Sequence, residues 1–246
     1  DCKAALIEAD GDTEKAVEIL KKKGQAKSDK RASAAATEGE LRAKVLGNGS
    51  SAIMVEVNIQ TDFSARNENF TKFVDNVFAV AEASKAGEDI AAKPYPGVEG
   101  KTVEEFRKEL SGTIGENIVV RRWVRFDLAG NGLIHSYVHM GGKIGVLIEI
   151  AADSEAVANH AATKKFADDV AMQIAAMNPQ YVERSEISAA EIEKQVVIFK
   201  GQLAEENKPE AAWPKIIEGK KAKWYTEVCL VDQESVLAPG SSIDKV

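Results

Sequence analysis

The feature that most constrains the fold is a pair of strand-like runs joined by a tight turn and followed at once by a helix-like run. Residues 40–57 contain two runs of strand character on either side of Asn48-Gly49, a dipeptide typical of β-hairpin turns. Residues 67–86 then place apolar side chains at helical spacing, which gives that helix one apolar face. A hairpin beside such a helix predicts an α+β fold in which the helix packs on a sheet.

Three more strand-like runs follow downstream, at residues 118–128, 133–140 and 143–150. Only short, glycine-containing segments separate each run from the next. Short turns between successive strands predict that these three runs form an antiparallel meander. A last strand is expected at residues 225–233.

Helix signals lie between and after these strands. Thr102 and Glu105 form a capping box, in which an N-cap hydroxyl and a nearby glutamate satisfy each other's backbone, for a helix expected to end near Leu110. Residues 153–178 predict one long helix that stops before Pro179.

Residues 188–224 predict an antiparallel helical hairpin. Ser188 and Glu191 form a second capping box, and Pro214 fits the first turn of the second helix. Apolar residues of the first helix are spaced as in a coiled coil, namely Ile192, Val196, Phe199 and Leu203. This seam is either the core of the hairpin or an exposed face for a homodimer or a 2:2 complex with a partner.

The N-terminal residues 1–24 predict two short helices, with Asp12 as an N-cap and Gly24 at the helix end. Two such helices cannot enclose a core. We therefore expect either a third helix upstream, in a reading frame longer than this chain, or docking of this helix pair on another surface. Residues 25–39 are polar without helical periodicity and predict a linker. The predicted division is a helical module at 1–24, a linker at 25–39, and two subdomains at 40–140 and 141–246.

Charge and cysteine content narrow the class of protein. The chain of 246 residues carries a net charge of −7, which argues against direct binding of nucleic acid through phosphate contacts. Cys2 and Cys229 form neither a disulfide framework nor a zinc motif, as is typical of a reducing, cytoplasmic setting. The longest apolar run, residues 144–152, is broken by Glu149 and is too short to span a membrane.

One small basic cluster, formed by Arg121, Arg122 and Arg125, is expected to be the solvated side of a strand, with partner contact as the alternative.

Catalytic candidates are few. His135 and His139 could serve a metal ion or a general base, but along a strand they lie about 13 Å apart, too far to share one zinc ion. Structural or contact roles are therefore favoured for both, and His160 is expected on a helix surface. The glycines at 141–142 lack the spacing of a phosphate-binding loop and lead into a strand. We expect neither an enzyme active site nor a cofactor.

A phenylalanine beside a carboxylate stands out between the hairpin and the first long helix. Asp62 and Phe63 fall where a connecting loop is expected. A loop phenylalanine usually packs beneath its own domain, and the alternative is a side chain that inserts into another protein. Residue types alone leave both open.

Five blocks, in order over nearly the whole chain, resemble the bacterial or organellar elongation factor Ts family: residues 1–24, 56–70, 114–122, 136–150 and 215–230. The resemblance implies a guanine nucleotide exchange factor for elongation factor Tu in translation elongation. It also implies a ubiquitin-associated-type helical module, two related α+β subdomains and a helical hairpin inserted in the second. Ile59 stands where the family often has cysteine, and parts of the family pattern are expected to be missing at both ends.

The contact residues are implied by position in the same way. The family's Asp-Phe contact with the partner's nucleotide domain falls on Asp62 and Phe63, its Ile-Gly contact on Ile114 and Gly115, and its histidine contact on His139. The resemblance suggests that Phe63 wedges against that domain and disturbs its magnesium site. The alternative function is a non-catalytic scaffolding or self-associating protein that uses the helical hairpin.

Overall fold

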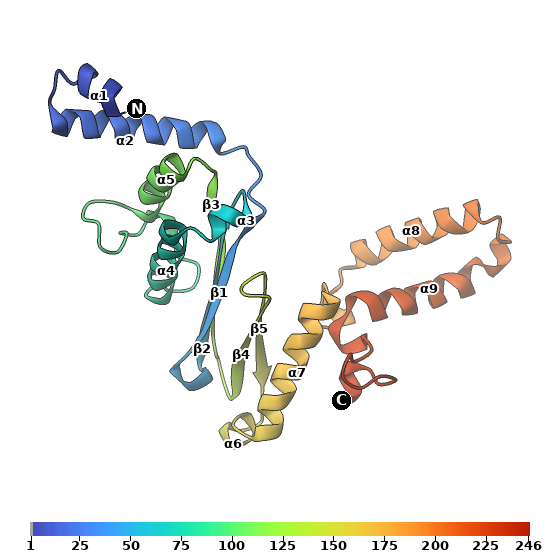
Figure 1. Ribbon diagram of the computed structural model, residues 1–246. Helices are drawn as coiled ribbons and strands as arrows, with labels where there is room; N and C mark the ends of the chain where they lie inside the picture. The colour runs from blue at the N-terminus through green and yellow to red at the C-terminus, as the bar shows by residue number, and fades with distance from the viewer. Residues whose placement is uncertain (1) are drawn as a thin grey trace. The chain divides into compact units, whose positions relative to one another are not determined.

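The computed structural model describes residues 2–246, apart from the side chains of Lys21, residues 25–30 and Asn48. The chain forms two compact units, Asp1–Lys164 and Lys165–Val246. Helices and antiparallel strands follow one another along the chain (Figure 1), which confirms the predicted α+β class. The division into a module, a linker and two subdomains stays a prediction.

Helices α1 (Cys2–Glu8) and α2 (Thr13–Arg31) form the predicted N-terminal pair. Asp12 Oδ1 accepts a hydrogen bond of 3.1 Å from Lys15 N, as expected of an N-cap. The prediction that the second helix ends at Gly24 is wrong, because α2 continues to Arg31 through the first part of the predicted linker.

Gly24 lies at a helix crossing instead of a helix end. A Cβ atom added to Gly112, on α5 (Val103–Ile114), would come within 2.7 Å of the carbonyl oxygen of Gly24. Because such a contact is too short for a real Cβ atom, the glycine at 112 is what lets the two helices approach so closely. In the sequence, a glycine within a polar stretch looks the same whether it ends a helix or crosses one.

A three-stranded antiparallel sheet has the order β1-β2-β3, formed by β1 (Glu38–Leu46), β2 (Ser51–Ile59) and β3 (Ile118–Asp127). The predicted hairpin is confirmed, with Glu38 paired to Ile59 and Leu46 paired to Ser51. Its connection differs from a two-residue turn, since Gly47–Gly49 form a 3-10 turn. The side chain of Asn48 lies outside the described residues.

Strands β4 (Gly132–His139) and β5 (Ile144–Ala151) form a separate two-stranded sheet. The predicted meander is therefore wrong, because β3 pairs with β2 and not with β4. The β4–β5 hairpin contacts β1, where Leu41 N donates to Gly142 O at 2.9 Å. Gly145 makes this packing possible, since a Cβ atom there would lie 2.2 Å from the Leu41 side chain.

Helices α4 (Glu68–Glu82) and α5 pack on the three-stranded sheet (Figure 1). The predicted apolar face of α4 is fully buried at Phe70, Phe73, Val74, Val77 and Ala81, while Phe78 is half-buried. The capping box at the start of α5 is present. This helix extends past the expected end near Leu110 to Ile114, and Ser111 Oγ donates to Glu116 O at 2.7 Å just beyond it.

The long helix predicted at residues 153–178 is two helices, α6 (Glu155–Ala158) and α7 (Ala161–Met177). The break occurs at His160, which is exposed as predicted but lies between the two helices and not on one. Its Nδ1 accepts a hydrogen bond from Ala162 N at 3.2 Å. That bond satisfies a backbone donor at the start of α7. The predicted stop before Pro179 is confirmed.

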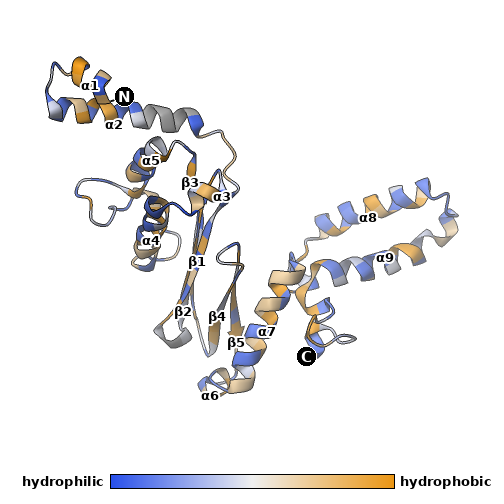
Figure 2. Cartoon of the chain, in the orientation of Figure 1, coloured by the Kyte–Doolittle hydropathy of each residue, from blue (hydrophilic) through white to orange (hydrophobic). Residues whose placement is uncertain are grey.

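The unit Lys165–Val246 contains the predicted helical hairpin, α8 (Ala189–Glu205) and α9 (Trp213–Val228), along which hydrophobic and hydrophilic residues alternate (Figure 2). The Ser188–Glu191 capping box and the first-turn Pro214 are both present. Phe199 and Leu203 are buried with Ile217, so this part of the seam is the core of the hairpin.

The strand predicted at residues 225–233 is wrong. Helix α9 runs to Val228, and Leu230–Asp232 form a 3-10 turn. Tyr225 packs against a small cluster with Cys229 at the base of the hairpin. The aromatic and β-branched residues that suggested a strand therefore fill a corner between a helix and a loop.

Among the described residues, no helix combines the length and the apolar character that crossing a membrane requires.

Candidate partner-binding site

Asp62 and Phe63 lie on α3 (Asp62–Ala65), a single helical turn between β2 and α4. Thr61 is the N-cap of this turn, and its hydroxyl accepts a hydrogen bond of 3.2 Å from Ser64 N. Asn67 then caps α4 by accepting from Asn69 N at 2.9 Å. Two caps in close succession turn the expected loop into a defined corner.

Phe63 is 86% exposed, the highest value among the large hydrophobic residues described. The alternative in which this ring packs beneath its own domain is thereby excluded. Asp62 is exposed as well, and its carboxylate lies 3.5 Å from Arg66 Nη2 one helical turn on. The corner therefore presents an aromatic ring and a carboxylate side by side to solvent.

Glu116 holds this corner from a distant part of the sequence. Its Oε2 accepts from Thr61 N at 3.0 Å, and its Oε1 accepts from Thr61 Oγ1 at 2.8 Å and from Ser64 Oγ at 2.7 Å. Partial burial raises the pKa of Glu116, but these hydrogen bonds outweigh burial and leave the pKa below its ordinary value of 4.5. Glu116 is therefore a carboxylate at neutral pH and can accept all three bonds.

Asn117 ties a third segment to the same place. Its backbone N–H donates to Gln60 Oε1 at 2.7 Å, and its side-chain amide donates to the carbonyl oxygens of Ala34 at 2.8 Å and Ala32 at 3.3 Å. The residue is 2% exposed. One buried side chain thus fastens the chain that follows α2 to the residues around the α3 cap.

Ile114 and Gly115 end α5 directly before Glu116. Gly115 adopts the left-handed conformation with φ of 89°, which allows the chain to leave the helix sharply. Ile114 is half-buried against the core of the sheet and its helices. Because Glu116 bonds to the α3 cap, the structure brings Ile114 and Gly115 to the same corner as Asp62 and Phe63.

His139 is the last residue of β4 and is exposed. Its Nδ1 lies 2.9 Å from the Tyr137 hydroxyl, and the two rings stack with centroids 5.8 Å apart. The turn that follows returns to β1 through an ion pair between Lys143 and Glu38, and Glu38 pairs with the last residue of β2. The turn that directly follows His139 therefore lies against the first half of β1, the half nearer the α3 corner.

Residue patterns in the sequence did not single out Glu116, Asn117 or Met140. Met140 is 69% exposed at φ of 50°, in the turn directly after His139, and adds apolar surface beside that histidine. Thr61 carried a usable signal, because threonine before a short helical turn is a preferred N-cap. Glu116 carried none, since the hydroxyls that it binds lie far from it in sequence.

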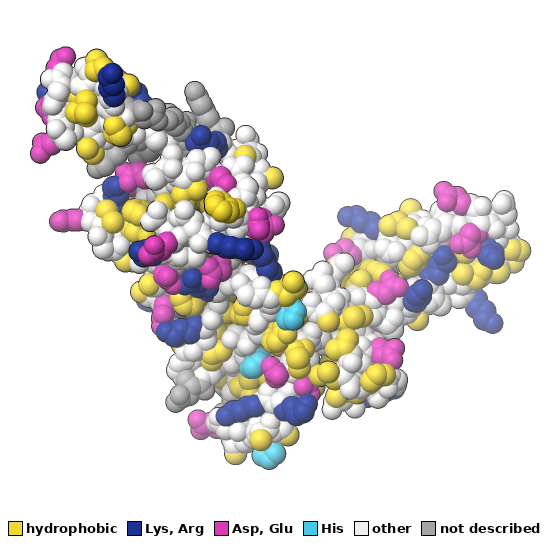
Figure 3. Space-filling model, in the orientation of Figure 1, with side chains coloured by type: hydrophobic (Ala, Val, Ile, Leu, Met, Phe, Trp, Pro, Cys, Tyr) yellow, Lys and Arg dark blue, Asp and Glu magenta, His cyan; other side chains and the backbone are white. Residues whose placement is uncertain are grey.

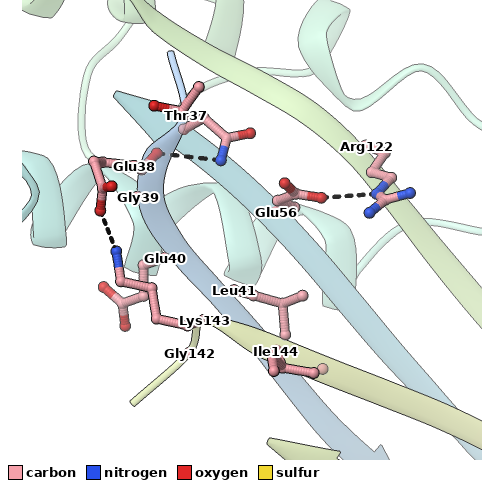
Figure 4. A pocket seen from close by; sticks show the side chains of 12 residues that line it. Thr37, Glu38, Gly39, Glu40, Leu41, Glu56, Arg122, Gly142, Lys143 and Ile144 are labelled. Carbon is pink, nitrogen blue, oxygen red and sulfur yellow. Dashed lines mark hydrogen bonds and ion pairs between the residues drawn. The ribbon is translucent and has the colours of Figure 1, made fainter. Parts of the chain in front are cut away.

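A polar pocket of about 250 Å³ lies between the first residues of β1 and the start of β5 (Figure 4). Its two basic side chains are both paired: Lys143 pairs with Glu38, and Arg122 Nε lies 2.7 Å from Glu56 Oε2. Cations that are already paired have little attraction left for a phosphate group. These ion pairs thus join the start of β5 to β1, and β3 to β2.

The basic cluster of Arg121, Arg122 and Arg125 is likewise paired with acidic side chains. Arg121 and Arg122 both approach Glu56, at 3.8 Å and 2.7 Å, and Arg125 Nε lies 2.9 Å from Asp127 Oδ1. On the face shown in Figure 3, acidic and basic side chains are interspersed. The solvated side of a strand is therefore favoured over partner contact for this cluster.

No group of three His, Cys, Asp or Glu side chains within residues 2–246, as far as the structure describes them, is placed to hold a metal ion. Burial and the nearby Asp232 raise the pKa of the Cys229 thiol, which keeps it protonated and unreactive. The arrangement at the α3 corner offers exposed contact groups on a rigid support.

Comparisons with known proteins agree on one family. The family model described as elongation factor TS matches residues 60–246. Elongation factor Ts of Syntrophotalea carbinolica is 44% identical over 251 residues, which cover 100% of this chain and 80% of that protein. The protein of the same name from Trichlorobacter lovleyi is 42% identical over 235 residues, covering 95% and 75%, and that from Nostoc punctiforme is 41% identical over 249 residues, covering 99% and 79%. The chain therefore belongs to the elongation factor Ts family.

Proposed function

We propose that this chain is a guanine nucleotide exchange factor that promotes GDP release from elongation factor Tu, and that Phe63 is the side chain that enters the partner. Family membership supports the exchange activity and the partner. The observation that carries the role of Phe63 is its 86% exposure on a turn fixed by hydrogen bonds. The setting is the cytoplasm or an organelle, where translation takes place.

Exchange of this kind needs no covalent chemistry and no cofactor of the factor's own. A protein that binds the nucleotide-free partner more tightly than the GDP-bound partner weakens GDP binding by the same ratio. A phenylalanine side chain that becomes buried contributes about 1.5–3 kcal/mol. If Phe63 is buried only against the nucleotide-free partner, that energy alone shifts GDP affinity by about tenfold to a hundredfold.

The partner's bound magnesium ion explains how an inserted side chain can weaken GDP binding. A divalent cation is the largest local charge in a phosphate site, so displacing the groups that hold it removes much of the affinity for GDP. A ring pushed between elements of the nucleotide domain can displace those groups without touching the nucleotide. Asp62 anchors the ring by hydrogen bonding, and Ile114, Gly115 and His139 contact the partner nearby.

The wedge works only if it is stiff. Behind the α3 corner, Phe70 and Phe73 of α4 are fully buried against β2. A turn that is already ordered loses little conformational entropy when it binds, so more of the contact energy appears as affinity.

Stopped-flow release of fluorescent GDP from purified elongation factor Tu tests this function. Phe63→Ala is expected to keep wild-type stability, because the ring has few contacts to lose, and to slow GDP release by about tenfold or more. Val157→Ala is the matched control, since Val157 is also exposed, at 47%, but lies on α6 away from the corner. Asp62→Ala should mainly weaken complex formation. An unchanged release rate in Phe63→Ala would exclude the wedge.

One observation favours a second function. Val197 and Ile198 of α8 are 59% and 51% exposed, an apolar surface that self-association through the hairpin would cover. A scaffolding or self-associating protein would then run as a dimer in size-exclusion chromatography, and the double substitution Val197→Ser and Ile198→Ser would return it to a monomer. Wild-type protein that elutes as a monomer at all concentrations would remove this alternative.

A further inference from the structure

We infer that Glu116 completes the N-terminal cap of α3 from a distance and is a positioning residue for nucleotide exchange. This inference rests on the proposed function, because the effect of Glu116 on exchange is expected to act through Phe63. It adds to that function a residue that lies outside the contact group and sets how the ring is presented.

The hydrogen bonds of Glu116 repeat those of a capping box. In the local capping box of α5, Glu105 Oε2 accepts from Thr102 N at 2.8 Å and from Thr102 Oγ1 at 3.0 Å, while Thr102 Oγ1 accepts from Glu105 N at 3.2 Å. At α3, Glu116 accepts from the backbone and hydroxyl of Thr61, and Thr61 Oγ1 accepts from Ser64 N at 3.2 Å. The same donors are satisfied in both turns.

The carboxylate must come from elsewhere because α3 has none at the required position. Ser64 occupies the place that Glu105 holds in α5, and a serine side chain is too short to reach back to the cap backbone. Glu116 supplies that acceptor and binds the Ser64 hydroxyl as well, at 2.7 Å. Thr61 at the N-cap and Ser64 three residues later are thus both bonded to the side chain of Glu116.

A helix of 4 residues depends on such a bond. One turn fixes several backbone dihedrals for very few internal hydrogen bonds, so it does not persist without outside contacts. Phe63 itself contributes little, because it is 86% exposed. Without Glu116, the turn that carries the ring is expected to become mobile, and binding must then order it again.

Glu116 also joins two parts of the contact group. It directly follows Ile114 and Gly115 in the chain, so one residue sets the spacing between the Ile-Gly contact and the Asp-Phe contact. The neighbouring Asn117 bonds to Gln60, which precedes the α3 cap. Glu116 and Asn117 therefore fix the position of the Ile-Gly contact relative to the Asp-Phe contact.

The first test measures exchange with three variants. Glu116→Ala is expected to slow GDP release by about tenfold, as the loss of several hydrogen bonds to one charged acceptor predicts. Glu116→Gln should restore most of the rate, because its amide oxygen can accept from Thr61 N while its NH₂ group donates to the two hydroxyls. Glu105→Ala is the matched control, since it removes the equivalent acceptor from the other cap. Equal rates in Glu116→Ala and wild type, or an equal loss in Glu105→Ala, would overturn the inference.

The second test separates this inference from the proposed function. In a Phe63→Ala background, Glu116→Ala should slow release by much less than the roughly tenfold expected in the wild-type background, because the main side chain that it positions is gone. A full additional loss would mean that Glu116 does not act through Phe63.

In the free protein, Glu116→Ala should speed amide hydrogen exchange of residues 61–66. This expectation does not depend on whether Phe63 affects GDP release. If amide exchange rises in Glu116→Ala but Phe63→Ala leaves GDP release unchanged, the proposed role of Phe63 is wrong and the remote cap by Glu116 is supported. Unchanged amide exchange would overturn the cap itself.

Discussion

The first turns of α3 and α5 satisfy the same backbone and hydroxyl groups, but the glutamate that does so comes from different places. In α5 it is Glu105, three positions along from the capped Thr102. In α3 it is Glu116, 55 residues from Thr61. The local cap begins a helix whose apolar face is buried, whereas the remote cap holds a short turn that exposes Phe63. A turn that must face a partner cannot rely on its own packing, so its support comes from a neighbouring element.

The largest expected difference between the two caps comes from removing each cap hydroxyl. Thr61→Val deletes one bond to Glu116 and the acceptor for Ser64 N, and should slow GDP release by about tenfold. Thr102→Val makes the same change at α5 and should cost about 1 kcal/mol of stability without slowing release. Stopped-flow exchange and urea denaturation of both variants check this. The comparison fails if both variants slow release alike.

A second substitution tests the segment after α2, which Asn117 fastens beside the remote cap. Asn117→Asp replaces the amide that donates to Ala32 and Ala34 with a carboxylate that cannot, which should cost about 1–2 kcal/mol of local stability. Amide hydrogen exchange after the end of α2 should become faster, with the α5 cap unaffected. Unchanged protection of residues 32–37 would show that Asn117 does not fasten this segment.

A substitution at Gly115, the C-cap of α5, is expected to have a smaller effect on stability. Gly115→Ala puts a side chain at φ of 89°, with open space around the new Cβ atom, so the cost is conformational and about 1 kcal/mol. Gly219→Ala is the control, because Gly219 lies within α9 without positive φ and should gain roughly 0.5–1 kcal/mol. Thermal unfolding of both variants measures the two signs. Equal shifts in the two variants would mean that backbone conformation is not what decides at Gly115.

The pH dependence should be the smallest effect. The pKa of Glu116 in the folded protein is below its ordinary value of 4.5, so its stabilisation is present above pH 4.5 and is lost as the pH falls through the folded pKa. The gap in melting temperature between wild type and Glu116→Ala should therefore close in acid. Glu105, whose pKa is lowered by hydrogen bonds from Thr102, should behave with the same sign. A gap that widens below pH 4.5 would contradict the assigned acceptor.

The two caps also mark what a sequence can reveal. Thr102 and Glu105 lie within one turn of each other, so their pairing is legible as a motif, and the same holds for the caps at Asp12 and Ser188. Thr61 and Glu116 become neighbours only after β3 pairs with β2. That pairing was mispredicted as a meander with β4, because turn length says which strands can pair but not which do.

Orientation was the other limit. The types and spacing of residues 58–70 left Phe63 either buried or exposed. In the structure Phe70 and Phe73 fill the core beneath the corner, and Phe63 stays 86% exposed. Gly24 posed a similar problem, since its role depends on Gly112 of another helix. Local motifs were therefore predictable, whereas contacts between distant segments were not.

The most direct test of the account places 4-fluorophenylalanine at position 63 and follows its ¹⁹F resonance. In the free protein the ring should show the full solvent isotope shift between H₂O and D₂O that its 86% exposure implies. On addition of nucleotide-free elongation factor Tu that shift should disappear, because the ring becomes buried in the partner. A resonance that keeps its solvent shift in the complex would contradict the claim that Phe63 is the inserted side chain.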